Sequence, residues 1–316
     1  MKRLADIAFL VRPPLLAASA TFFFAGAVSA ERVARGTYSI RLMVRALPDL
    51  GLYLLVVASA FVVNQIFDVE SDALNRKNLI LPSGAVTRRE SLMLACLLGA
   101  AAAVLGVWRG GLVSVLVLVG LALGAAYSVP PVRLKARAGA DFLANTVGFG
   151  WIGFLMGWLA VGDFGREAVM RSLPYASAMG AVFLNTCIPD EAGDRAVGDA
   201  TTCVVFGKRA VGIAALALMT AAFVAGVYLD ETICSLAALA VMPAFAAVAA
   251  EPTAANSVLA SQLAGRVLFL LIAIMAPLLG AFGAVAYILS RIYYARRFGA
   301  EYPRLTGARF ESGASR

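Results

Sequence analysis

Residues 46–72 read ALPDLGLYLLVVASAFVVNQIFDVESD. The first part, residues 46–67, is an apolar run of the length that crosses a membrane as a helix. A chain in lipid must satisfy its own backbone hydrogen bonds, so a run of this kind has to be helical. The last part places Asn64, Asp68 and Asp72 at positions i, i+4 and i+8, which puts their side-chain oxygens on one face of that helix.

The composition of the whole chain agrees with this stretch. Of the 316 residues, 61% are hydrophobic and 15% are charged, compared with about 45–50% and about 25% in soluble domains. A soluble globular protein is therefore excluded. Similar apolar runs recur about nine times, at residues 6–30, 46–67, 90–108, 111–129, 140–162, 172–190, 209–229, 232–250 and 264–289. We predict a single all-α integral membrane domain, residues 1–316, with a core at about 6–290 and a polar, basic tail at 291–316.

The residue types that are missing exclude several kinds of chemistry. The chain has no histidine, which excludes imidazole bases and histidine metal ligands. The net charge of +8 fits binding to anionic lipid headgroups or to an anionic substrate. The chain has no soluble basic domain of the kind that binds nucleic acid. Carboxylates must therefore carry any acid, base or metal chemistry.

The carboxylates gather in two short windows. Nineteen Asp and Glu serve the whole chain, and seven of them lie in residues 68–72 and 190–199. In the second window, Asp190 and Asp194 stand four residues apart, as Asp68 and Asp72 do. Charged residues at helix ends are often only solvated caps. However, like charges at this spacing repel, so two such sets on one membrane face suggest a cation held between them. Hard oxygen ligands favour Mg²⁺, which usually binds a few carboxylates together with substrate phosphates.

Basic residues follow these acidic windows. Arg76 and Lys77 follow the first window, Arg133 and Lys135 follow the fourth predicted span, and Arg195 follows the second window. All three loops lie on the side of the N-terminus, because the second, fourth and sixth spans end there. We expect this convergence of cations with carboxylates to serve a phosphate or diphosphate.

The orientation in the membrane follows from the Lys and Arg count. Thirteen of these residues lie on the side of the acidic windows and seven lie in the opposite loops, which predicts that the acidic side is cytoplasmic. With nine crossings, the tail from Arg291 onward falls on the opposite side.

Three motifs resemble those of one family, the UbiA superfamily of membrane prenyltransferases. Residues 64–72 resemble its NxxxDxxxD motif, residues 190–194 its DxxxD motif, and residues 127–135 its Tyr-Ser-x-Pro-Pro loop. The resemblance covers about residues 10–290 in the same order. Gln65, Leu79 and the sequence Ile188-Pro189-Asp190 are similar to the homogentisate prenyltransferase branch, whereas Thr186-Cys187 replaces the Lys-Asp usual there.

The resemblance implies a bundle of about nine transmembrane helices around a lateral cavity that is open to lipid. It implies that Mg²⁺ ions between the two motifs bind an isoprenyl diphosphate. The metal ligands would be Asn64, Asp68, Asp72, Asp190 and Asp194. The same four aspartates and Tyr127 would be catalytic, and the substrate would be bound by Asn64, Arg76, Lys77, Arg133, Lys135 and Arg195.

Three functions remain open at this point. The first is an Mg²⁺-dependent prenyltransferase that transfers an isoprenyl chain to an aromatic or other lipophilic acceptor. The second is a UbiA-type terpene cyclase, in which a double bond of the same substrate is the acceptor. The third is a transporter with carboxylates inside the membrane; against it, the carboxylates fall at helix ends on one face, and no inverted repeat is visible. The sequence shows no polar pocket that would identify an acceptor.

Overall fold

The computed structural model describes residues 2–36, 40–74 and 79–302, and every regular element in them is a helix. Nine helical segments of this part are long and apolar enough to cross a membrane. The long helices are α2 (Pro13–Arg35), α4 (Leu47–Leu74), α5 (Arg88–Arg109), α6 (Gly111–Ser128), α9 (Arg166–Ala196), α11 (Lys208–Tyr228), α12 (Thr232–Ala250), α13 (Ala254–Met275) and α14 (Pro277–Phe298). Of these, α9 is not one of the nine apolar segments, which instead include Ala140–Leu159, built from three short helices. The short ones are α1 (Lys2–Leu10), α3 (Ile40–Arg45), η1 (Leu134–Ala136), α7 (Ala140–Asn145), the π-helix η2 (Thr146–Ile152), α8 (Gly153–Leu159) and α10 (Thr202–Phe206).

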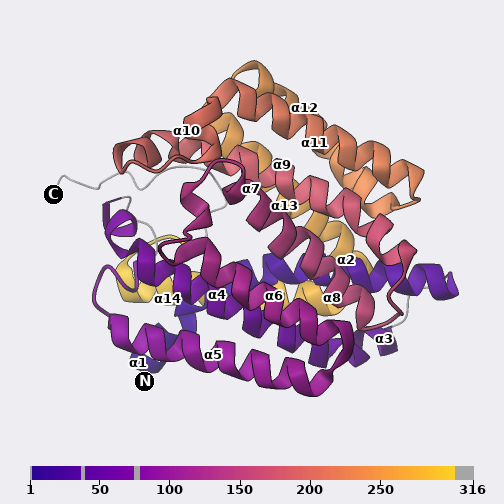
Figure 1. The fold of residues 1–316 in the computed structure, drawn as a ribbon, viewed down its shortest axis with the longest axis horizontal. Helices are drawn as coiled ribbons and strands as arrows, with labels where there is room; N and C mark the ends of the chain where they lie inside the picture. The colour runs from indigo at the N-terminus through magenta and orange to yellow at the C-terminus, as the bar shows by residue number, and fades with distance from the viewer. Residues whose placement is uncertain (1, 37–39, 75–78, 303–316) are drawn as a thin grey trace.

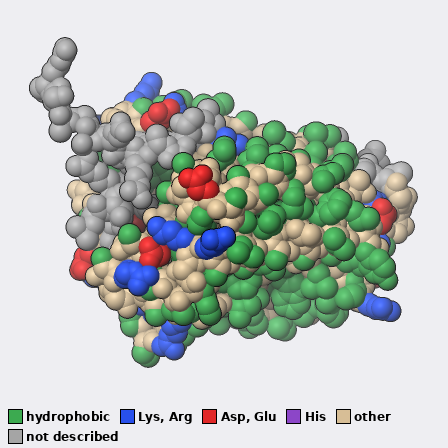
Figure 2. Space-filling model, turned by 90° about the horizontal axis from the view of Figure 1, so that it is seen from above, with side chains coloured by type: hydrophobic (Ala, Val, Ile, Leu, Met, Phe, Trp, Pro, Cys, Tyr) green, Lys and Arg blue, Asp and Glu red, His purple; other side chains and the backbone are tan. Residues whose placement is uncertain are grey.

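The helices lie side by side along the longest dimension of the molecule (Figure 1). In that view α5 forms one edge and the α11–α12 pair forms the other, with α8 and α9 between them. Acidic and basic side chains are found mainly toward the two ends, and apolar side chains cover most of the surface between (Figure 2). This distribution matches a bilayer, in which the middle of the surface faces hydrocarbon.

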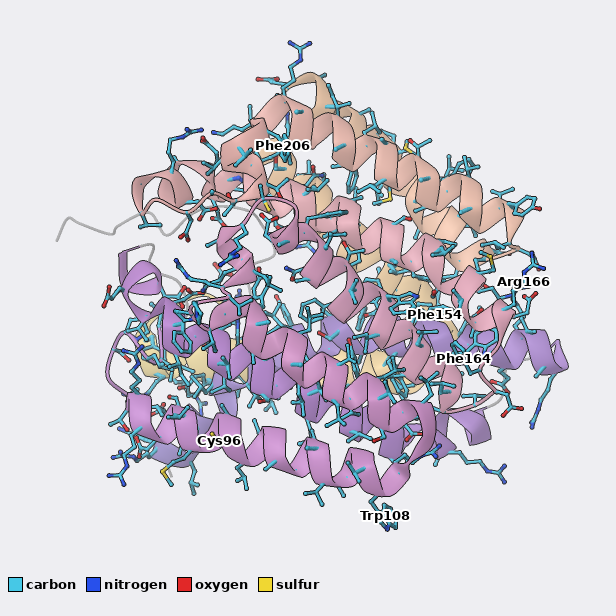
Figure 3. All side chains as sticks on the ribbon, in the orientation of Figure 1. Cys96, Trp108, Phe154, Phe164, Arg166 and Phe206 are labelled. Atoms are coloured by element: carbon cyan, nitrogen blue, oxygen red, sulfur yellow. The ribbon has the colours of Figure 1, made fainter. Side chains whose placement is uncertain are left out.

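Two exposed aromatic residues fit the same picture. Trp108 is 85% exposed and Tyr228 is 87% exposed, and Trp108 points away from the end of α5 (Figure 3). Such exposure would be unusual in water. Trp and Tyr are enriched at membrane interfaces, where the ring is apolar and its polar group reaches water. The exposed rings at the ends of α5 and α11 therefore favour an interfacial position.

Local sequence sets both ends of α5. At the start of α5, the Glu90 backbone N–H donates to the Thr87 hydroxyl at 3.3 Å, and the Thr87 N–H donates to the Glu90 carboxylate at 2.9 Å. This reciprocal pair satisfies backbone donors that a helix start leaves free. Gly110 and Gly111 then make the turn into α6 with φ of 74° and 59°, values that side chains rarely allow.

Glycines bring α2 and α8 into backbone contact. A Cβ atom added to Gly26 would lie 1.9 Å from the Phe154 carbonyl oxygen, and one added to Gly157 would lie 1.7 Å from the Phe23 carbonyl oxygen. Small residues permit such close packing in membranes, where water does not drive helices together. The α2–α8 contact therefore requires glycine on both helices.

The structure corrects two of the predicted segments. The predicted span 264–289 is in fact parts of two helices, α13 and α14, which meet at Ala276. Pro277 disfavours the helical conformation in the residue before it, and Ala276 accordingly has φ −123° and ψ 77°. The predicted tail from residue 291 is helical as far as Phe298, and residues 303–316 lie outside the described part.

Because α13 and α14 replace a single predicted span, the end of α14 lies on the other side of the bundle from the predicted one. We call the end of the bundle that holds Asp68 and Asp194 the motif face. Asp6 of α1 accepts hydrogen bonds from the Tyr293 hydroxyl at 2.6 Å and from Arg297 Nε at 3.0 Å. These contacts hold the end of α14 at the N-terminal side, which is the side of the motif face. The opposite-side position that nine crossings would give to Arg291 and the residues after it therefore does not hold for the described residues.

We expect Asp6→Asn to destabilise the fold. Asp6 is 2% exposed. The substitution removes the negative charge of its carboxylate and leaves Arg297 without an anionic partner. Breaking such a pair should cost about 2 kcal/mol, measured as a lower midpoint of thermal unfolding in detergent. Arg3→Gln is the control, because Arg3 pairs with Glu90 but is 65% exposed. Equal midpoints for the two variants would contradict a specific role of Asp6.

Candidate functional site

The first acidic motif lies on the last turns of α4. Asn64 Nδ2 donates to Asp68 Oδ2 at 2.9 Å and to the Ser128 hydroxyl at 3.4 Å. Asp68 is half-buried and Asp72 is 6% exposed. The i, i+4 spacing puts Asn64 and Asp68 on the same face of the helix, and the bond to Ser128 turns that face toward the end of α6.

The loop after α6 connects the two acidic motifs. Lys135 Nζ forms a short ion pair with Asp68 Oδ1. Arg133 Nη1 pairs with Asp199 Oδ1 at 2.7 Å, and the Asp199 backbone N–H donates to the Asp194 carbonyl at 3.0 Å. Two cations that are two residues apart therefore reach α4 on one side and the end of α9 on the other.

The second acidic motif lies on the last turns of α9, which continues through Pro189 to Ala196. Asp194 Oδ2 accepts a hydrogen bond from the Thr201 hydroxyl at 3.1 Å, and the side chain of Asp190 is exposed. Arg195 Nη2 pairs with Glu191 at 2.6 Å on the same helix. Arg195 thus pairs with a carboxylate inside the motif, but one other than its two aspartates, and its side chain is 60% exposed.

Asp141, which the sequence analysis did not select, fastens the second motif to the loop. It is 1% exposed and accepts hydrogen bonds from the backbone N–H groups of Thr202 and Phe142, both at 2.7 Å. Nearby, the Ala200 N–H donates to the Ala136 carbonyl at 3.0 Å. An Asp directly before an apolar run is a common helix-start signal, so nothing in the sequence distinguished Asp141 from an ordinary cap.

Tyr127 and Cys187 both lie near Asp141, Tyr127 on the side of the first motif and Cys187 on the side of the second. Tyr127 lies beside Asn145 and within electrostatic range of both Asp68 and Asp141. Cys187 on α9 is within the same range of Asp141, Asp190 and Asp194. The two motifs therefore border one region at the motif face, between α4, α6, α7 and α9.

The last two predicted residues, Arg76 and Lys77, lie outside the described residues.

Two aromatic side chains lie on the motif side of α4. Phe149 of η2 stacks on Phe61 of α4 with ring centroids 5.7 Å apart. Phe61 is the residue that sequence reasoning missed; it precedes Asn64 by three positions, which places it on the motif side of α4.

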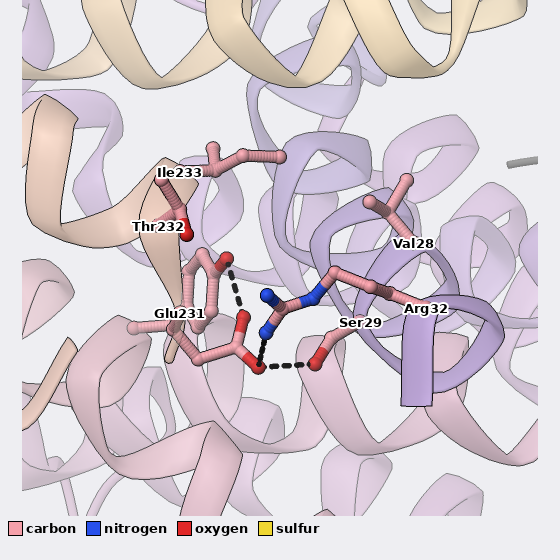
Figure 4. Close-up of a pocket in the computed structure, with 7 residues that line it drawn as sticks. Val28, Ser29, Arg32, Glu231, Thr232 and Ile233 are labelled. Carbon is pink, nitrogen blue, oxygen red and sulfur yellow. Dashed lines mark hydrogen bonds and ion pairs between the residues drawn. The ribbon is translucent and has the colours of Figure 1, made fainter. Parts of the chain in front are cut away.

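A second polar cluster surrounds Glu231, which lies between the end of α11 and the start of α12; Figure 4 shows its residues. Glu231, 3% exposed, accepts hydrogen bonds from Ser29 at 2.5 Å, Arg171 at 2.8 Å and Tyr175 at 3.2 Å. The adjoining cavity measures about 10 Å³, room for one water at most. These bonds join α2 and α9 to the start of α12, so we interpret the cluster as structural.

Comparisons with known proteins agree with this arrangement. The chain is 30% identical over 185 residues to 2-acyl-4-prenylphloroglucinol 6-prenyltransferase of Humulus lupulus, which is 55% of this chain and 45% of that protein. It is 31% identical over 198 residues to digeranylgeranylglyceryl phosphate synthase of Methanoregula boonei, 60% of this chain and 66% of that one. The matches to such curated relatives span about half of their length.

Solved structures show the same fold. A UbiA homologue from Archaeoglobus fulgidus, bound to GPP and Mg²⁺, superposes with a TM-score of 0.63 at 18% identity, covering 89% of this chain and 99% of that one. The model of the UbiA prenyltransferase family matches residues 18–257. This range includes both acidic motifs and the loop that joins them, and the chain is therefore a member of the UbiA prenyltransferase family.

Proposed function

We propose that this protein is an Mg²⁺-dependent intramembrane prenyltransferase, which ionises an isoprenyl diphosphate and transfers the prenyl group to an aromatic or other lipophilic acceptor. One observation carries the proposal: the loop at 133–135 reaches both acidic windows, because Lys135 pairs with Asp68 and Arg133 pairs with Asp199, five residues after Asp194. Cations at these positions would stabilise negative charge on a metal-bound diphosphate between the motifs. Relatives that include homogentisate phytyltransferases and digeranylgeranylglyceryl phosphate synthases support the same chemistry.

The carboxylates fit Mg²⁺ in the company of a substrate. Among the residues that the structure describes, no group of three His, Cys, Asp or Glu can hold a metal ion without further ligands. Mg²⁺ usually binds through one or two carboxylates, waters and substrate phosphates, and α4 and α9 each supply such a pair. Asp68 already holds the Lys135 ammonium, so this carboxylate accepts a cation. Bound there, Mg²⁺ would neutralise negative charge on the departing diphosphate.

The chain's own residues act on both halves of the reaction. When the C1–O bond breaks, its electron pair leaves with the diphosphate, where Lys135 and Arg133 stabilise the charge. The allylic cation that remains must be kept from water, and the apolar helices exclude water. Aromatic faces such as that of Phe149 stabilise the cation. Ring electrons of an aromatic acceptor form the new C–C bond, and the ring then loses a proton.

The proposal is tested by incubating the purified protein with Mg²⁺ and isoprenyl diphosphates of several lengths, with and without aromatic acceptors. Products are identified by mass spectrometry. We expect diphosphate release and a prenylated acceptor, both dependent on Mg²⁺. A cyclic hydrocarbon or terpene alcohol formed equally without acceptor would show cyclisation instead, and no diphosphate release under any condition would contradict both enzyme functions.

Lys135→Ala should raise the KM for the donor diphosphate about tenfold, because it removes one charge-assisted contact worth about 1.4 kcal/mol. It should also weaken inhibition by inorganic pyrophosphate. Arg133→Ala should act in the same direction. Arg296→Ala is the control, since Arg296 lies at the end of α14 at the same face. Equal changes in all three variants would show that general surface charge, not a diphosphate site, was being measured.

We further propose that the motif face is cytoplasmic. The excess of Lys and Arg predicted for that side grows with Arg291, Arg296 and Arg297, which belong to the last turns of α14. A tag at the C-terminus should then be accessible to protease in inside-out vesicles and protected in right-side-out ones. The reverse pattern would contradict this orientation.

A further inference from the structure

The short helix α10 ends at the surface of the protein on the motif face. Its start is buried, since Thr202 is 8% exposed and Cys203 is 0% exposed, whereas Val205 is 53% exposed and Phe206 is 62% exposed. Figure 3 shows Phe206 beside the start of α11. With five residues, α10 is too short to cross a membrane. Two large apolar side chains are therefore exposed at an end of the molecule where charged groups gather.

Two cations follow these apolar side chains directly. Lys208 and Arg209 are the first residues of α11, and both are exposed. Lys208 lies 3.6 Å from Glu191, a carboxylate that Arg195 already holds at 2.6 Å, and Arg209 forms no ion pair within the described ranges. The dipole of a helix opposes cations in its first turn, so Lys208 and Arg209 do not stabilise α11. Their positive charge is therefore left largely uncompensated by the protein.

This combination of side chains fits one occupant. We call Val205, Phe206, Lys208 and Arg209 the α10 surface. Figure 2 looks down on the edge formed by α11 and α12 and shows Lys and Arg side chains gathered at one end of it, next to apolar surface. Segments of this kind lie in the membrane interface, with apolar side chains among the acyl chains and cations at anionic headgroups. A free phosphate would leave the apolar side chains in water.

The α10 surface is connected to the second acidic motif through the start of α10. The Thr201 hydroxyl donates to Asp194 Oδ2 at 3.1 Å, and the Thr202 backbone N–H donates to Asp141 Oδ2 at 2.7 Å. Phe206 follows Thr202 by four residues, which is about one helical turn. A contact that holds Phe206 in the interface therefore restrains the backbone from which Thr201 reaches Asp194.

We propose that the α10 surface docks onto the anionic phospholipids of its leaflet, and that this contact holds the second acidic motif in position. Val205 and Phe206 lie among the acyl chains, and Lys208 and Arg209 bind the headgroup phosphates. Such docking goes beyond prenyl transfer, because it makes turnover depend on the charge of the surrounding lipid. It also gives α10 a role that a membrane-crossing helix cannot have, since α10 lies where headgroups are.

A lipid titration of the full-length protein in detergent tests the docking. Phosphatidylglycerol should raise the midpoint of thermal unfolding, and phosphatidylcholine should not. Arg209→Gln should increase the phosphatidylglycerol concentration needed for half of this rise about fivefold, because a cation at an anionic lipid surface contributes about that factor. Phe206→Ser should act in the same direction.

Two controls separate this surface from the rest of the protein. Arg296→Gln removes a cation from the end of α14 on the same face. Phe164→Ser removes a ring that is 54% exposed near the start of α9, at the other end of that helix (Figure 3). Neither should change the titration. Equal changes in Arg209→Gln and Arg296→Gln would contradict a specific surface, and an equal rise with glycerol phosphate or inorganic phosphate would show a free-anion site instead of lipid docking.

Hydrogen–deuterium exchange tests the link to the motif without requiring prenyl transfer. In nanodiscs that contain phosphatidylglycerol, the amides of residues 201–207 should exchange about fivefold more slowly than in phosphatidylcholine nanodiscs, because lipid binding and local opening are linked. Arg209→Gln should lose this difference. The Mg²⁺ concentration for half-maximal turnover should fall in the same nanodiscs for the wild type and not for Arg209→Gln. Exchange that is equal in the two lipids would overturn the link between the α10 surface and Asp194.

Discussion

Asp68→Asn and Asp190→Asn should each lower turnover at least about a hundredfold. Both substitutions keep the size of the side chain but remove the negative charge that would bind Mg²⁺ and, through it, the diphosphate. Asp72→Asn and Asp194→Asn should have comparable effects, since each helix contributes a pair. The measurement is the rate of diphosphate release at saturating donor, over a range of Mg²⁺ concentrations.

Glu191→Gln is the control for this series. Glu191 lies between Asp190 and Asp194 on the same helix, but it pairs with Arg195 at 2.6 Å and Lys208 at 3.6 Å. Its loss should lower turnover far less. If one of the four aspartate variants kept a normal rate at saturating Mg²⁺, that aspartate would not be a metal ligand.

Asp141→Ala should damage both stability and catalysis. The buried carboxylate accepts two backbone hydrogen bonds, from Thr202 and Phe142, as well as one from the Thr202 hydroxyl. Leaving buried donors without a charged acceptor costs about 2–3 kcal/mol. The segment that carries Thr201 would loosen, and with it the contact from Thr201 to Asp194. We expect a lower unfolding midpoint and about a tenfold fall in turnover, roughly 1.4 kcal/mol.

Asp141 acts through other residues, so its variant must be separated from a simple loss of fold. Thr202→Val removes the hydroxyl but keeps the backbone bond to Asp141, and its effects should be smaller in the same direction. A shift of the Mg²⁺ activation curve in Asp141→Ala, at a temperature where the protein is folded, would indicate misplacement of Asp194. Wild-type stability and turnover would contradict a positioning role.

The sequence alone determined that the membrane segments are helical and, within one helix, which side chains share a face. Apolar runs of membrane length have no other stable backbone in lipid, and the spacing of four residues places Asn64 with Asp68, and Asp190 with Asp194, by helix geometry alone. The three motifs, in their order, also predicted the family to which the chain belongs. Each of these conclusions depends on residues that are close together along the chain, where helical periodicity applies.

The tertiary structure decided what no local pattern contains. Lys135 and Asp68 are 67 residues apart, Arg133 and Asp199 are 66 apart, and helical periodicity carries no information over such distances. The break at Ala276 was hidden because its flanking residues are apolar, and only Pro277 marked it. Which carboxylate pairs with which cation depends on how the helices pack, because packing alone brings these distant residues together.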